Sequence, residues 1–169
     1  MFGNVKTLRE LFEIELRYAY DAEKKLADKG IPSMIESASS PELRSGLQAH
    51  LNETQNHVVR LERVFASLGI EPETKTNEIL DKMTSAAKDS TSNIEQSALR
   101  DAALIANGNT VEHYEIALYG TLISFAKALA LQNVVGPLQE TLEEEKKADA
   151  KLTHLAETIT NTRAASVTA

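Results

Sequence analysis

Two acidic residues stand where a buried helix face would normally carry leucine. Helical spacing around residues 105–122 gives one face made of Ile105, Gly108, Glu112, Glu115, Tyr119 and Leu122. Removing an isolated carboxylate from water is costly, so a buried one must find a partner, take up a proton or bind a cation. The pattern therefore predicts a polar or metal-binding site inside a helical core.

Three other segments interrupt their apolar faces in the same way, and their polar residues complete the candidate set. If these segments pack as a bundle, the interruptions lie near mid-length of each helix and meet at one level. A competing interpretation is a helical bundle whose acids lie on solvated faces. The candidate metal ligands are Glu23, His50, Glu53, His57, Glu112, Glu115, Glu145 and Asp149.

The donor types of this set indicate a metal class. Carboxylates concentrated in a core repel one another at low effective dielectric, and cations relieve that repulsion. Oxygen donors with one or two imidazoles and no sulfur suit iron or manganese better than structural zinc or copper. Bridging carboxylates let two cations share one site, so we expect two iron ions, with manganese as the alternative. The choice of ligand between His50 and His57 stays open, as does the inward acid of Glu144 and Glu145.

The elements that must position these residues read as four long helices. The segment Ser40-Pro41-Glu42 is typical of a helix start, Gly69 of a helix end, and Gly30-Ile31-Pro32 of an interruption. We expect an all-α four-helix bundle with a long crossover that carries one short extra helix. The expected ranges are 5–39, 40–69, 94–129 and 134–160 for the helices, 73–92 for the crossover, 1–160 for the single domain and 161–169 for a disordered tail.

Composition excludes several classes of function. The 169 residues include no cysteine, which rules out disulfides, cysteine-ligated metals and thiol catalysis. A net charge of −7 argues against general binding to nucleic acid or anionic membranes. No segment approaches the roughly 20 apolar residues that span a bilayer. We therefore expect a cytoplasmic protein with neither nucleic acid nor membrane as a partner.

Together these features resemble the ferritin-like superfamily, and more narrowly the YciF family of bacterial stress-associated proteins. The resemblance implies a four-helix bundle with a di-iron or di-manganese centre. One departure is that ferritin-like enzymes use Glu-x-x-His on the second helix, whereas Asn56 stands three residues after Glu53 and the histidine is His57. The segments that carry the resemblance are 20–26 (YDAEKKL), 50–54 (HLNET), 100–105 (RDAALI), 111–120 (VEHYEIALYG) and 142–146 (LEEEK).

The leading functional hypothesis is a di-metal redox protein that binds O2 or hydrogen peroxide. Glu53 and Glu115 are the predicted bridging ligands and Glu23 and Glu145 the terminal ones, while Glu112, Asp149 and a histidine complete the shell. Because the chain has no Cys-x-x-Cys module, a peroxidase would need an external electron donor, whereas catalase-like disproportionation would need none. The alternative is a non-enzymatic stress or interaction protein, a homodimer, with a structural or vestigial metal site.

Neighbouring residues have weaker assignments. Tyr119 lies one turn beyond Glu115 and is predicted to donate a hydrogen bond to that carboxylate, to act in electron transfer or to be a plain core tyrosine. His113 and His154 stand beside the apolar faces and read as surface or supporting residues.

Overall fold

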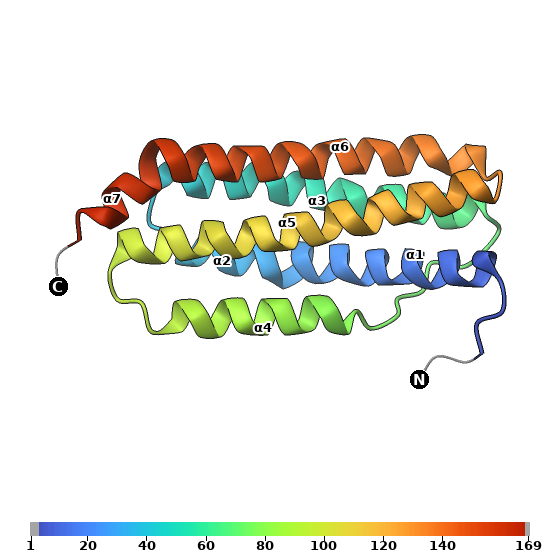
Figure 1. The fold of residues 1–169 in the computed structure, drawn as a ribbon, viewed down its shortest axis with the longest axis horizontal. Helices are drawn as coiled ribbons and strands as arrows, with labels where there is room; N and C mark the ends of the chain where they lie inside the picture. The colour runs from blue at the N-terminus through green and yellow to red at the C-terminus, as the bar shows by residue number, and fades with distance from the viewer. Residues whose placement is uncertain (1–3, 168–169) are drawn as a thin grey trace.

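The computed structural model describes residues 4–167, and all regular elements within that range are helical. Helices α1, α3, α5 and α6 run side by side along the long axis, and α4 lies outside them (Figure 1). The predicted four-helix bundle with a helical crossover is confirmed. The elements are α1 (Leu8–Lys25), π-helix η1 (Leu26–Gly30), α2 (Ile31–Ser37), α3 (Pro41–Ser67), α4 (Glu78–Ser92), α5 (Ser97–Ala128), α6 (Gln132–Leu155), π-helix η2 (Ala156–Thr160) and α7 (Asn161–Ala165).

The helix ends follow local capping chemistry. Thr7 and Glu10 form a capping box at the start of α1. The Ser40 hydroxyl accepts a hydrogen bond from the Leu43 amide, and Pro41 occupies the first helical position of α3. Gly69 ends this arm with a φ of 69°, a conformation that glycine adopts without strain. The start and end predicted for this helix are confirmed.

The predicted interruption near Gly30 is a π-helical segment. Residues Leu26–Gly30 form η1 and α2 continues the arm directly, with Pro32 in its first turn. A π segment widens the helix locally without ending it, so α1 and α2 lie end to end in Figure 1. Ile31 remains buried, which keeps α2 against the bundle.

Polar contacts fasten the crossover helix α4 at its N-terminal end. The Asn77 amide donates to Asp21 Oδ2 at 2.8 Å, and Asn77 Nδ2 donates to the Tyr114 hydroxyl at 2.7 Å. Lys25 Nζ contacts Asp81 Oδ1 at 2.6 Å. Helix α4 also packs against α5. The crossover is therefore an ordered part of the domain that lies along one side of the bundle.

The apolar core consists of two clusters separated along the bundle. In α1, the listed residues of the first cluster come before the candidate ligand, and in α3 and α5 they come after the candidate ligands. Along each of these helices and its direct continuation, the listed residues of the second cluster lie on the other side of the ligands. The order along each helix therefore places a polar layer between the clusters. The first cluster includes Phe12, Leu16, Leu61, Phe65, Leu118, Tyr119, Leu122, Leu138 and Leu142. The second includes Leu26, Ile31, Leu43, Leu47, Leu104, Ile105 and Leu152.

The C-terminal segment differs from the disordered tail predicted from residue 161. Residues Asn161–Ala165 form α7, and Ala164 is buried. Segment η2 continues α6 directly into α7, and α7 also packs against α5. These contacts hold the short helix against the bundle. Residues 168 and 169 lie outside the described range.

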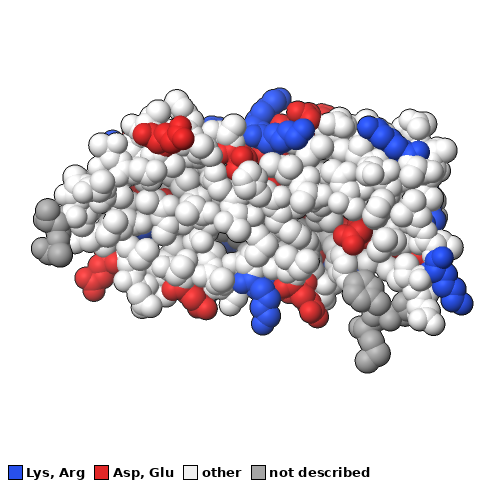
Figure 2. All heavy atoms as spheres, viewed as in Figure 1, with Lys and Arg blue, Asp and Glu red and all other residues white. Residues whose placement is uncertain are grey.

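The surface adds little to this framework. Acidic and basic side chains are interspersed on the face shown in Figure 2 and gather into no single patch there. Among the described helices, none combines the length and the apolar composition that crossing a bilayer requires.

Candidate metal centre

Two groups of potential metal ligands meet in the polar layer. We name Glu23, His57 and Glu145 the closed triad, and His50, Glu112 and Glu145 the open triad. Within each group the ligand atoms lie within 4.8 Å of one another. The carboxylate of Glu145 belongs to both groups. The arrangement is therefore one continuous cluster with two adjacent positions for a cation.

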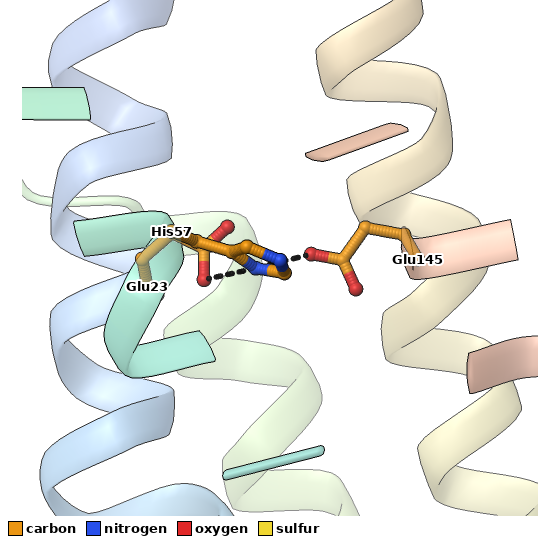
Figure 3. A group of neighbouring side chains, drawn as sticks. All are labelled: Glu23, His57 and Glu145. Carbon is orange, nitrogen blue, oxygen red and sulfur yellow. Dashed lines mark hydrogen bonds and ion pairs between the residues drawn. The ribbon is translucent and has the colours of Figure 1, made fainter. Parts of the chain in front are cut away.

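The closed triad is sealed from solvent. His57 Nδ1 lies 3.3 Å from Glu23 Oε2 and 3.1 Å from Glu145 Oε1, and the two carboxylates approach it from opposite sides (Figure 3). The side chains of Glu23, His57 and Glu145 are at most 1% exposed. Three helices, α1, α3 and α6, supply these residues. Such burial of charge requires partners or cations.

The second ring nitrogen of His57 is held from outside the triad. His57 Nε2 lies 2.9 Å from Glu144 Oε2, and the same oxygen accepts a hydrogen bond from Arg60 at 2.7 Å. Arg60 also donates to the Thr141 hydroxyl at 2.7 Å. A carboxylate on the far nitrogen fixes the tautomer and orientation of a ligand histidine. Nδ1 is thereby directed into the cluster.

The open triad is less enclosed. His50 Nε2 lies 3.1 Å from Glu112 Oε1, and its side chain is 11% exposed. His50 Nδ1 lies 3.6 Å from Glu53 Oε2, beyond good hydrogen-bond length. A small pocket of about 170 Å³ between α3 and α6 reaches both His50 and Glu112. This half of the cluster is therefore reachable from the surface.

Glu115 lies beside both triads and has no hydrogen-bond partner for its Oε1 atom. Besides burial, the charges of Glu145, Glu23 and Glu112 raise the pKa of its carboxyl group. Glu112 Oε2 and both oxygens of Glu145 also lack hydrogen bonds among the described atoms, although Glu145 Oε1 approaches His57 without hydrogen-bond geometry. Unpaired buried carboxylate oxygens are costly, and here several of them lie in the same polar layer. A cation would provide the missing partner.

Protonation reflects the same crowding of charge. Burial alone lowers the pKa of His57, but Glu23 and Glu145 outweigh it and raise that pKa to about 11. Burial likewise opposes protonation of His50, yet Glu112 and Glu53 raise its pKa to about 10. Burial raises the pKa of Glu112 to about 7, and burial beside other carboxylates raises the pKa of Glu115 well above its usual value. Without a bound cation, protons on these histidines and glutamates offset part of the crowded negative charge.

The six central residues match the inventory of carboxylate-bridged dinuclear sites, which use four glutamates and two histidines. The distribution differs, because α3 supplies both histidines and α5 supplies two glutamates. The solvated-face interpretation does not hold for Glu23, Glu112, Glu115 and Glu145, which are at most 3% exposed. The residues brought together are Glu23, His50, His57, Glu112, Glu115 and Glu145.

Two of the predicted ligands lie at the margin of this cluster. The Glu53 side chain is 48% exposed and approaches only His50 among the cluster residues. The Asp149 side chain is 20% exposed, and its Oδ1 lies 3.9 Å from His113 Nε2. Neither residue belongs to a triad. The ligand roles of Glu53 and Asp149 stay predictions.

The tyrosine beside the site contacts a different partner from the one predicted. The Tyr119 hydroxyl donates to Glu23 Oε1 at 2.5 Å, across to α1, and not to Glu115 on its own helix. The hydroxyl thereby holds one oxygen of Glu23 while the other faces His57. Arg60 was absent from the sequence-based set. Its position three residues after His57, one helical turn away, is the signal that could have included it.

Comparison with known proteins assigns the chain to a family. The family described as a domain of unknown function, DUF892, matches residues 7–165. The chain is 37% identical to Protein YciF of Escherichia coli strain K12 over 157 residues, which cover 90% of this chain and 92% of that protein. The chain belongs to the YciF family.

Solved structures of similar proteins have the same fold. YcfI of Rhodopseudomonas palustris is 39% identical with a TM-score of 0.87, covering 90% of this chain and 98% of that one. The E. coli stress protein YciF is 36% identical with a TM-score of 0.85, covering 90% and 96%. A Xanthomonas campestris protein, 23% identical over 90% and 93% of the two chains, shares the fold with a TM-score of 0.69. Membership of the YciF family and the ferritin-like bundle are thus confirmed.

Proposed function

We propose that this protein is a dinuclear metal oxidoreductase that reacts with O2 or a peroxide during stress. The observation that carries the proposal is the sharing of Glu145 between two buried triads. The name of the E. coli relative, a stress protein, supports the setting. The ferritin-like fold, which often holds di-iron or di-manganese centres, supports the metal class.

The residues fit two divalent ions in number and charge. One position takes Glu23, His57 Nδ1 and Glu145, and the other takes His50 Nε2, Glu112 and Glu145. Glu115 belongs to neither triad, but its unpaired oxygen and its charge interactions with Glu145, Glu23 and Glu112 make it the candidate for an additional ligand. The four carboxylates Glu23, Glu112, Glu115 and Glu145 carry four negative charges when ionised, which balance two divalent cations. We propose iron as the bound metal, with manganese as the alternative, because the donors combine carboxylates with imidazoles and include no sulfur.

A bound pair of redox-active ions would supply the two electrons that reduction of a peroxide requires. The chain itself holds the ligands in place. Tyr119 fixes Glu23, and Glu144 with Arg60 fixes the ring of His57. The apolar clusters on both sides exclude water from the closed triad. In a peroxidase cycle an external electron donor would restore the reduced state.

Metal analysis combined with turnover measurements tests this function. Protein purified without chelator is expected to hold about two equivalents of iron or manganese per chain. It should also consume oxygen or peroxide. Glu145→Gln should lose most of the bound metal and most of the turnover, since it removes a ligand from each triad. The control Glu143→Gln, on the exposed side of α6, should keep the metal and the turnover. Less than one equivalent in the wild type would contradict the proposal.

The second candidate is a non-enzymatic stress or interaction protein, a homodimer, whose metal site is structural. The enclosure of the closed triad favours this alternative, because a structural ion needs no access. In that case metal removal would lower the unfolding midpoint, while oxygen and peroxide consumption would stay at the level of free metal.

A further inference from the structure

A large groove beside α4 leads to the candidate metal centre. Its volume is about 930 Å³. Its walls come from the end of α1, from η1 and α2 on one side and from α4 on the other, and α5 contributes the floor. Residues of the crossover helix, including Thr84, Ala87 and Lys88, line its outer side. The groove exists because α4 packs on α5 and leaves space beside η1 and α2.

The inner end of this groove is bounded by the open half of the metal centre. His50, Glu112 and Glu115 line it there. Each has a buried side-chain atom without a hydrogen bond, namely His50 Nδ1, Glu112 Oε2 and Glu115 Oε1. Glu23 and His57 of the closed triad do not line it. A molecule in the groove therefore approaches the cluster from the side formed by His50, Glu112 and Glu115.

Apolar side chains line the approach to these polar groups. Leu26, Met34, Leu104 and Leu152 belong to the lining, together with Gly108. A Cβ atom on Gly108 would lie 2.9 Å from Leu152 Cδ1 and 3.4 Å from Met34 Cε. The glycine thus preserves space where α2, α5 and α6 approach one another. A ligand entering here would contact hydrocarbon first and oxygen donors last.

The size of the groove distinguishes between substrates. A water-sized molecule such as hydrogen peroxide occupies on the order of 30 Å³, whereas pockets for organic ligands range over about 300–1,000 Å³. At about 930 Å³ the groove belongs to the second class. O2 or hydrogen peroxide would leave most of it filled with water against apolar walls, and an organic molecule would displace that water favourably.

Charges at the rim do not select strongly for an ionic ligand. Lys25 is paired, because its Nζ lies 2.6 Å from both Asp21 Oδ2 and Asp81 Oδ1. The other rim charges, such as Lys29 and Asp28, are of both signs. The mixed rim suits a molecule with a neutral body.

We infer that the groove binds the apolar body of an organic hydroperoxide and directs its peroxy group toward Glu112, Glu115 and His50. The inference rests on the proposed function, whose substrate class it names. Reduction breaks the O–O bond, consumes two electrons and two protons, and yields one alcohol and one water. A bound pair of redox-active divalent ions would supply the two electrons, and an external reductant, a thiol or a reduced flavoprotein, would restore them.

Binding to the metal-free protein tests the groove independently of any turnover. The probe is 2-phenyl-2-propanol, the alcohol product of cumene hydroperoxide, titrated calorimetrically into chelator-treated protein. We expect one binding site per chain. Thr84→Trp from α4 and Met34→Trp from α2 should each weaken binding by roughly tenfold or more, because an indole would fill the groove. Ile79→Trp, which adds the same group at a 60% exposed position of α4 outside the lining, should not.

A second measurement compares oxidants on the metal-loaded protein. Thr84→Trp and Met34→Trp should slow metal oxidation by cumene hydroperoxide about tenfold and leave oxidation by hydrogen peroxide unchanged, since the smaller molecule also has the pocket between α3 and α6. Thermal unfolding identifies any variant that fails to fold, and the other variant then carries the test. Absence of probe binding to the wild type, or binding that neither indole weakens, overturns the groove assignment.

The two proposals fail in different ways. Probe binding, combined with less than one metal equivalent in protein purified without chelator, would contradict the proposed function and support an organic ligand site. Two metal equivalents without probe binding would support the function and overturn the hydroperoxide assignment.

Discussion

The two halves of the candidate centre have nearly the same donors but different surroundings. The closed triad of Glu23, His57 and Glu145 is sealed, and Tyr119 and Glu144 hold its residues from outside. The open triad of His50, Glu112 and Glu145 borders the groove beside α4 and the pocket between α3 and α6. Nearly the same ligand chemistry would therefore serve two purposes in the proposed centre. The sealed half would hold an ion firmly, and the accessible half would leave room for a reacting molecule.

The largest expected effect is a difference in the free energy of unfolding between variants of the two histidines. His57→Ala leaves Glu23 and Glu145 buried without their cationic partner, and such losses cost about 3–5 kcal/mol. His50→Ala, at a partly exposed position with one close carboxylate, should cost about 1–2 kcal/mol. Urea unfolding of both variants in chelator measures the difference. Equal losses would show that the two triads are energetically alike.

The next effect is a dependence of stability on pH in the metal-free protein. His50 and His57 keep their protons up to pKa values of about 10 and 11, whereas in the unfolded chain they release them near pH 6.5. The raised histidines therefore stabilise the fold fully below about pH 6.5, and this stabilisation is lost as pH rises through the folded values. Glu112, raised from 4.5 to about 7, contributes in the same direction at lower pH.

We therefore expect the unfolding midpoint of chelator-treated protein to fall between pH 6 and pH 9. The limiting slope is about 1.4 kcal/mol per pH unit for each group. Added metal should displace these protons, bind more tightly at higher pH and flatten the dependence. A midpoint that rises with pH in the metal-free protein would contradict the protonation described above.

A smaller effect concerns the tyrosine of the sealed half. Tyr119→Phe keeps the ring in the core and removes only the hydrogen bond to Glu23, so a loss of about 1–2 kcal/mol is expected in the metal-free protein. Tyr20→Phe is the matched control, since its hydroxyl donates to Glu62 nearer the surface. We expect the control to lose less than half as much. A larger loss in the control would remove the special role of Tyr119.

The smallest effect is expected at Glu53, at the margin of the cluster. Glu53→Ala removes a side chain that is 48% exposed, and we expect metal content to change by less than about half an equivalent, with stability within about 0.5 kcal/mol. Measuring the metal content of Glu53→Ala and of His50→Ala under the same conditions provides the comparison. Loss of a full equivalent in Glu53→Ala would restore the bridging role predicted from the sequence.

These residues also show what sequence patterns reveal. Glu23, Glu112, Glu115 and Glu145 were predictable because each interrupts an apolar stripe, and a stripe faces the core whatever its neighbours are. Glu53 shows the limit of this reasoning. The adjacent Thr54 is 1% exposed and takes the inward position, and one residue along a helix rotates the side chain by about 100°.

Contacts between helices lie beyond such patterns. The spacing of Tyr119 from Glu115 indicates a shared face but not which helix the hydroxyl meets, and the structure gives α1. The bundle and its crossover followed from helix periodicity and the caps at Ser40 and Gly69. The groove did not, because it depends on how far α4 stands from η1 and α2. No periodicity within one segment records that distance.

The π-helical segment η1 sets the direction in which the rest of this arm faces. A π turn accommodates one more residue than the α-helix that would replace it, so deleting one residue within Leu26–Gly30 would restore regular winding and leave Ile31 facing the core. If all five residues instead wound as an α-helix, everything beyond them would turn by roughly 100° about the helix axis. Ile31 would then leave the core, and the wall formed by Met34 would move with it. The wide turn therefore compensates for one residue and keeps α2 in the wall of the groove.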